Sequence, residues 1–112
     1  MDKLKKILQK YPGLGLKTLA FLVLQIYNNN CHFFTVELKY TKTNKITFSP
    51  HQIAFHVKHS RNTFILVFDA SCRLPKLYEG KDIRNLVAGG LRLEPKVSGF
   101  KEIENFLSTL GA

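Results

Sequence analysis

The fold is decided by residues 33–69, which read FFTVELKYTKTNKITFSPHQIAFHVKHSRNTFILVFD. This stretch predicts a strand, a helix and a second strand. In the first segment the hydrophobic residues alternate with a period of two, so that one face of a strand carries Phe34, Val36, Leu38 and Tyr40. Ser49 followed by Pro50 is typical of the N-cap and first position of a helix. Residues 63–70, TFILVFDA, form a continuous apolar run of strand type.

The segment before this stretch predicts a helix and a β-hairpin. Residues 2–13, DKLKKILQKYPG, have apolar side chains at helical spacing until Pro12 and Gly13 end the helix. Two strand-like runs follow, residues 17–27 and 31–40, separated by three asparagines that tolerate the left-handed backbone of a tight turn.

The segment after it predicts two more helices. Residues 80–90, GKDIRNLVAGG, resemble a short helix closed by two glycines. Residues 100–110, FKEIENFLSTL, have one apolar stripe that packs back on the body, formed by Phe100, Ile103, Phe106, Leu107 and Leu110. We therefore expect an α/β (α+β) domain spanning residues 1–112, with a small mixed β-sheet flanked by helices in the order α-β-β-α-β followed by C-terminal helices.

The helix predicted after Ser49 has three distinct sides on a helical wheel. The apolar side carries Ile53, Ala54 and Val57, and roughly opposite lie His51, Phe55 and Lys58. A polar stripe between them carries Gln52, His56 and His59. Paired histidines on a helix can hold zinc, but no further ligand follows at a suitable spacing, which favours a solvated or phosphate-contacting face.

The composition predicts a polyanionic partner. Seventeen Lys and Arg against eight Asp and Glu give 112 residues a formal net charge of +9, and nucleic acid is the usual partner of such a chain. Charge that serves solubility alone, acidic lipid and an acidic protein surface are the alternatives. Phe33, Phe34, Tyr40 and Phe55 lie among basic residues where bases can stack, although Phe34 and Tyr40 are expected in the core and Phe55 against a neighbouring element.

The two cysteines and the longest apolar run bear on the compartment. Cys31 and Cys72 form no disulfide framework or metal pair, which favours a reducing compartment. Residues 19–27, LAFLVLQIY, are too few to span a membrane and lack the small residues of a signal-peptide cleavage site. We expect a buried strand there, no membrane partner, and a protein of the cytoplasm of a cell or of a phage- or virus-infected host.

Glu37 and Lys39 lie two positions apart on the face of the first strand opposite Phe34. A carboxylate is a hard oxygen ligand for Mg²⁺, and an ammonium beside it can orient water and offset the charge of a phosphate. Such a pair suits metal-assisted cleavage of phosphodiesters. Without its context, Glu-x-Lys would more simply be a solvated surface pair.

In its context, the stretch resembles the PD-(D/E)XK nuclease superfamily, especially the VRR-NUC and Holliday-junction-resolvase-like phage and archaeal branches. A hydrophobic strand ends in Glu-x-Lys, and a polar connection leads to a helix beginning Ser-x-x-Gln and then to another hydrophobic strand. The resemblance implies a restriction-endonuclease-like core, a homodimer, and a DNA endonuclease that uses Mg²⁺ or Mn²⁺. Glu37 would be a metal ligand, Lys39 would position or activate water, and Gln52 would support the site. Independently of the resemblance, we expect basic and titratable residues near the pair to contact phosphates: Lys42, Lys45, His51, His56, Lys58 and His59.

The sequence departs from this family at one position. The family has an Asp roughly a dozen residues before the Glu, where this chain has Leu24 or Gln25. Asp69, at the end of the later strand, is the candidate for the second metal carboxylate, unless a partner subunit supplies one or Asp69 only starts a turn. The remaining alternative is a nuclease fold that binds nucleic acid without cleaving it.

Overall fold

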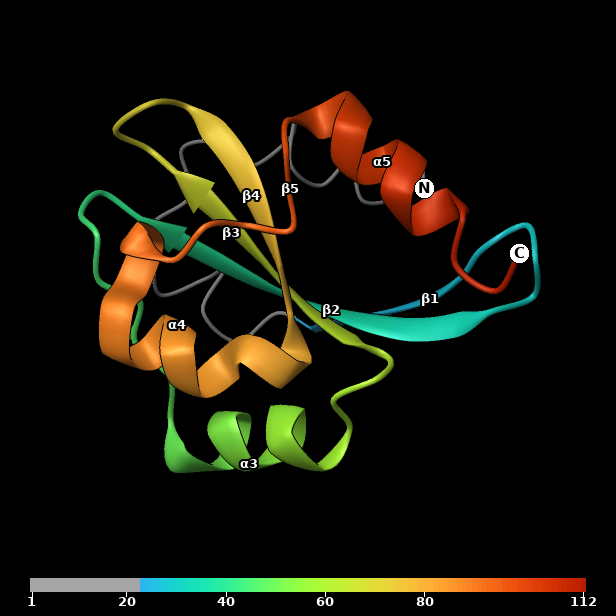
Figure 1. Cartoon of the computed structure of the whole chain (residues 1–112), viewed down its shortest axis with the longest axis horizontal. Coiled ribbons are helices and arrows are strands. Elements are labelled where there is room, and N and C mark those ends of the chain that lie inside the picture. The colour runs from blue at the N-terminus through green and yellow to red at the C-terminus, as the bar shows by residue number, and fades with distance from the viewer. Residues whose placement is uncertain (1–22) are drawn as a thin grey trace.

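A computed structural model describes residues 23–112, which form a mixed α/β fold around one twisted sheet (Figure 1). Its strands within this range are β1 (Val23–Tyr27), β2 (Phe33–Thr41), β3 (Thr63–Asp69), β4 (Leu74–Glu79) and β5 (Val97–Ser98), and they lie in sequence order across the sheet. Only β2 and β3 are parallel; the other neighbours are antiparallel. The mixed sheet flanked by helices is thus confirmed, while the helix predicted in residues 2–13 lies outside the described residues.

The parallel pair is joined by α3 (Pro50–Lys58), as the central stretch predicts. Ser49 caps the helix: its Oγ accepts from the backbone N–H of Gln52, and the Gln52 side chain accepts from the backbone N–H of Ser49. This reciprocal capping box and Pro50 at the first position fix the start of the helix. We call residues 33–69 the β2–α3–β3 unit.

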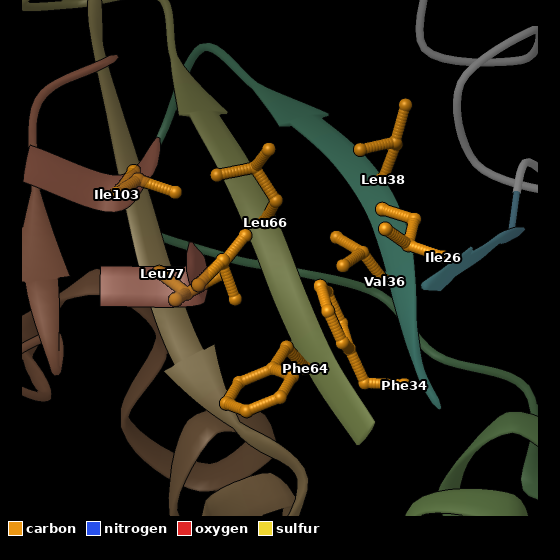
Figure 2. Packing of buried hydrophobic residues seen from close by; sticks show 9 residues of the cluster. Ile26, Phe34, Val36, Leu38, Phe64, Leu66, Leu77 and Ile103 are labelled. Atoms are coloured by element: carbon orange, nitrogen blue, oxygen red, sulfur yellow. The ribbon is translucent and has the colours of Figure 1, made fainter. Parts of the chain in front are cut away.

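Helices cover both faces of the sheet. On one face α5 (Phe100–Ser108) lies against β4 and β5, and its Ile103 belongs to the same hydrophobic cluster as the even-numbered side chains of β2, among them Phe34 and Val36 (Figure 2). On the other face lie α3 and α4 (Ile83–Gly89), which pack on odd-numbered residues of β3 such as Ile65 and Val67. The 3₁₀ turns η1 (Gly80–Asp82) and η2 (Gly90–Arg92) flank α4. The two hydrophobic clusters account for the alternation read from the sequence.

The predicted hairpin is confirmed, but its left-handed residue is Cys31 (φ 57°) and not an asparagine. The asparagines make hydrogen bonds instead. Asn28 Oδ1 accepts from the backbone N–H groups of Asn30 and His32, and its Nδ2 donates to the carbonyls of Leu107 and Leu110. Asn30 Nδ2 also donates to carbonyls at this end of α5. The turn is therefore tied to the C-terminal helix.

Three further observations differ from or extend the sequence predictions. Strands β4 and β5 were not expected, because Pro75 and Lys76 interrupt the apolar pattern of β4 and β5 has only two residues. In residues 19–27, the part described includes Ile26, which is buried, and Tyr27, which is 71% exposed, so a wholly buried strand is not what forms. Among residues 23–112, no helix combines the length and apolar character needed to cross a membrane.

Candidate functional site

Glu37 and Lys39 meet in the interior beneath α3. They share a face of β2, as the period of two predicts, and Lys39 Nζ lies 3.4 Å from Glu37 Oε2. The Lys39 side chain is only 6% exposed, and the Glu37 side chain only 3%. The pair is therefore an internal ion pair rather than an open pair facing solvent.

His56 completes this pair from the helix. Its Nε2 lies 3.2 Å from Glu37 Oε1, and the residue is 1% exposed. The prediction that His56 contacts phosphates is thus wrong. The helix turns Gln52, Ile53 and His56 toward the sheet and leaves Ala54 and Val57 exposed, because the polar partners of Glu37 and Lys39 take the inward positions.

Lys39 also has acceptors in the segment that leads into α3. Its Nζ donates to the carbonyl of Thr47 at 2.8 Å and to Gln52 Oε1 at 3.1 Å, and it lies 4.6 Å from the centre of the Phe48 ring. Burial lowers the pKa of Lys39 below its usual value, and the charge of Glu37 opposes that shift. The predicted contact of Gln52 with the pair is present, although Gln52 also belongs to the capping box.

The described residues do not fit Mg²⁺ or Mn²⁺ at this pair. Glu37 lies beside Ile65 in the sheet, whereas Asp69 lies beside Thr41, four residues or about 13 Å farther along the strands. Both oxygens of Glu37 already face nitrogens, and a hard divalent ion needs several free oxygens. Within residues 23–112, no three His, Cys, Asp or Glu side chains come together as a ligand group.

Asp69 is held in an ion pair of its own. Its Oδ2 lies 3.1 Å from Lys76 Nζ, and its Oδ1 accepts from the hydroxyl and the backbone N–H of Ser71. Burial acts to raise the pKa of Asp69, but the hydrogen bonds from Ser71 and Lys76 prevail and lower it to about 2. This carboxylate therefore stabilises the β3–β4 turn, which agrees with the reading of Asp69 as a turn residue.

A cavity of about 540 Å³ opens where β2 and β3 begin and α3 ends. Its lining combines aromatic, basic and small polar side chains: Gln25, Phe33, Thr35, Phe55, Lys58, His59, Ser60, Arg61, Asn62 and Thr63. Thr35 is two positions before Glu37 on the same face of β2, but Glu37, Lys39 and His56 themselves do not line the cavity.

Other predicted phosphate contacts lie at the two ends of α3. Lys58 and His59 are exposed and line the cavity, whereas Lys42, Lys45 and His51 are exposed near the opposite end, where the chain leaves β2 and enters the helix. Arg61 was missed by sequence reasoning. Its position in the short link between the predicted helix and the following strand was the signal that could have placed it near the end of that helix.

Phe55 does not pack into a neighbouring element as predicted. It is 37% exposed, and its ring lies 5.0 Å from that of His59. Phe34 is buried in the core and Tyr40 packs partly against it, as predicted, while Phe33 is 40% exposed beside the cavity.

Comparison with known proteins does not assign this chain to a family. The chain matches no family model, and neither the curated proteins nor the solved structures contain a match. The function must therefore be inferred from the residues themselves.

Proposed function

We propose that the protein binds nucleic acid through the β2–α3–β3 unit. The observation that carries the proposal is the distribution of charge in this unit. Residues 38–68 contain no Asp or Glu, and their exposed cations are Lys42, Lys45, Lys58 and Arg61. Glu37, just before them, is buried and paired. Within residues 38–68, the exposed cations therefore have no carboxylate of the same segment to offset their charge, which suits phosphate binding.

The outward face of α3 connects the two groups of cations. His51, Phe55 and Lys58 are spaced four and three residues apart, so they follow one face of the helix, and all three are exposed. Lys42 and Lys45 precede the helix and Arg61 follows it. A nucleic-acid backbone laid along this nine-residue helix, about 13 Å long, meets cations at both ends.

The test is the salt dependence of DNA binding, measured by fluorescence anisotropy between about 50 and 200 mM salt. We expect affinity to fall steeply, because each lysine–phosphate contact releases counterions. The double variant Lys58→Gln/Arg61→Gln should weaken binding and make the slope of log affinity against log salt shallower by about 1.4 for single strands.

The matched control is Arg84→Gln/Lys101→Gln, which removes the same two residue types from exposed positions on α4 and α5. It should retain most of the slope. Equal losses in the two double variants, or an affinity independent of salt, would contradict binding through the β2–α3–β3 unit.

DNA cleavage by a restriction-endonuclease-like fold is the second candidate. The contact among Glu37, Lys39 and Gln52 favours it, since these are the residues to which the superfamily resemblance assigns catalysis. We prefer nucleic-acid binding over cleavage because the pair is buried and contains only one carboxylate. Incubation of supercoiled and branched DNA with Mg²⁺ or Mn²⁺ separates the two. Cleavage that is lost in a folded Lys39→Met variant and kept in Lys101→Gln would establish the nuclease.

A further inference from the structure

The cavity at the end of α3 has the size and lining of a ligand site. Its volume of about 540 Å³ falls in the range of roughly 300–1,000 Å³ common for small-molecule sites. Lys58 and Arg61 line it, and no carboxylate does. A ligand with a negative charge and a flat apolar part matches this combination.

Two half-exposed phenylalanines provide flat apolar surface. Phe33 comes from β2 and Phe55 from α3, and they are 40% and 37% exposed. Each has a second ring beside it: Tyr27 lies 5.0 Å from Phe33, and His59 lies 5.0 Å from Phe55. Large exposed aromatic rings beside cations are typical of surfaces on which bases stack.

Two buried hydroxyl groups in the lining have unused hydrogen-bonding capacity. Thr35 and Thr63 are partners in the sheet, and they are only 8% and 2% exposed. Neither Oγ1 has a hydrogen-bond partner among residues 23–112. Thr63 Oγ1 lies against Gly80, which is not part of the lining. Buried hydroxyls are normally satisfied, so the hydroxyl of Thr35 is the candidate partner for a polar group of a ligand. The exposed Gln25, the sheet partner of Thr35, adds an amide to the same lining.

We propose that the cavity receives one unpaired nucleobase of a single strand. The base stacks on Phe33 or Phe55, its polar edge meets Thr35 and Gln25, and Lys58 and Arg61 hold the adjacent phosphates. The inference rests on the proposed nucleic-acid binding and deepens it: a base within a duplex is stacked and paired and cannot enter, so the preferred partner is single-stranded.

The deciding experiment compares three probes of equal length, about 12 nucleotides, by fluorescence anisotropy at low salt. The probes are single-stranded oligothymidylate, a strand with the same sugar-phosphate backbone but no bases, and a duplex. We expect the base-containing single strand to bind about tenfold or more tightly than the abasic strand, whose phosphate charge is the same. Phe55→Leu should reduce this difference, whereas Phe100→Leu, which alters a residue of the same 37% exposure on α5, should not.

Thr35→Val provides an independent variant, because it keeps the shape of the side chain and removes the hydroxyl. It should weaken binding of oligothymidylate and leave the abasic strand unaffected. Equal binding of all three probes, with a normal salt slope, would overturn the base site while leaving the proposed function intact. No binding of any probe at low salt would overturn both. The comparison of the three probes on the wild-type protein tests the base site even if a variant fails to fold.

Discussion

Glu37 is the one acidic residue between residues 32 and 68, and its side chain lies in the interior between Lys39 and His56. Moving a carboxylate and an ammonium out of water costs several kcal/mol for each ion, and the attraction within the pair only offsets this cost. The pair is thus weak evidence for net stabilisation. Each partner nevertheless depends strongly on the other, because neither charge has access to water.

Removal of one charge from this pair should destabilise the fold strongly. We expect Glu37→Gln to lower the free energy of unfolding by about 3 kcal/mol, because it leaves Lys39 buried without a counter-charge. Urea denaturation followed by circular dichroism at neutral pH measures the change.

The double variant Glu37→Gln/Lys39→Met is the control for this coupling. It should lose clearly less stability than the sum of the two single variants, since the buried charge is then absent. Losses that add to within about 0.5 kcal/mol would show that the ion pair does not couple the two residues. A Glu37 variant that loses DNA binding or cleavage must therefore first be shown to be folded.

Asp69 makes the fold sensitive to acid. Its pKa is lowered to about 2 from the usual 3.8, so the folded state prefers the ionised form. The stabilisation is fully present above about pH 4 and is lost as pH falls toward 2, a contribution of about 2 kcal/mol. We expect Asp69→Asn to be less stable than wild type at pH 6 and to lose less further stability on acidification. Chemical denaturation at a series of pH values measures this. An unchanged acid dependence in Asp69→Asn would assign the effect to other groups.

At the scale of the element, the start of α3 and the buried ion pair share one side chain. Gln52 Oε1 accepts from both the backbone of Ser49 and Nζ of Lys39. We expect Ser49→Ala to cost about 1 kcal/mol, the usual loss for an N-cap. Gln52→Ala should cost more, because it removes the second half of the capping box and an acceptor of Lys39. Urea midpoints of the two variants measure the difference. Equal costs would mean that the helix start and the ion pair are independent.

The same element shows where sequence reasoning succeeds and fails. The N-cap and the following proline predicted where α3 begins, because capping chemistry is local. The inward face was assigned correctly at Ile53 and incorrectly at Ala54 and Val57, because a helical wheel ranks residues by hydrophobicity. Polar His56 and Gln52 take the inward positions instead, since their partners on β2 are buried charges. That preference depends on a strand more than ten residues away, which no local pattern includes.

At the scale of the whole molecule, the period of two in β2 predicted both the core face and the contact of Glu37 with Lys39. The cavity could not be predicted, because Gln25, Phe33, Phe55 and Arg61 come together only when the sheet and helix are assembled. Asp69 was placed on the correct strand, but its distance from Glu37 depends on the register of the parallel pair. The single domain, the homodimer and DNA as partner stay predictions.

The hydrogen bonds from Asn28 and Asn30 to the carbonyls of residues 107–110 have a consequence for biosynthesis. They join positions about 80 residues apart in the chain, since Asn28 and Leu107 are separated by 79. A contact at such separation closes late, because a long loop must be ordered first. During synthesis we therefore expect the β1–β2 turn to gain these hydrogen bonds only after α5 has left the ribosome, so that the apolar side of the sheet stays open to aggregation until then.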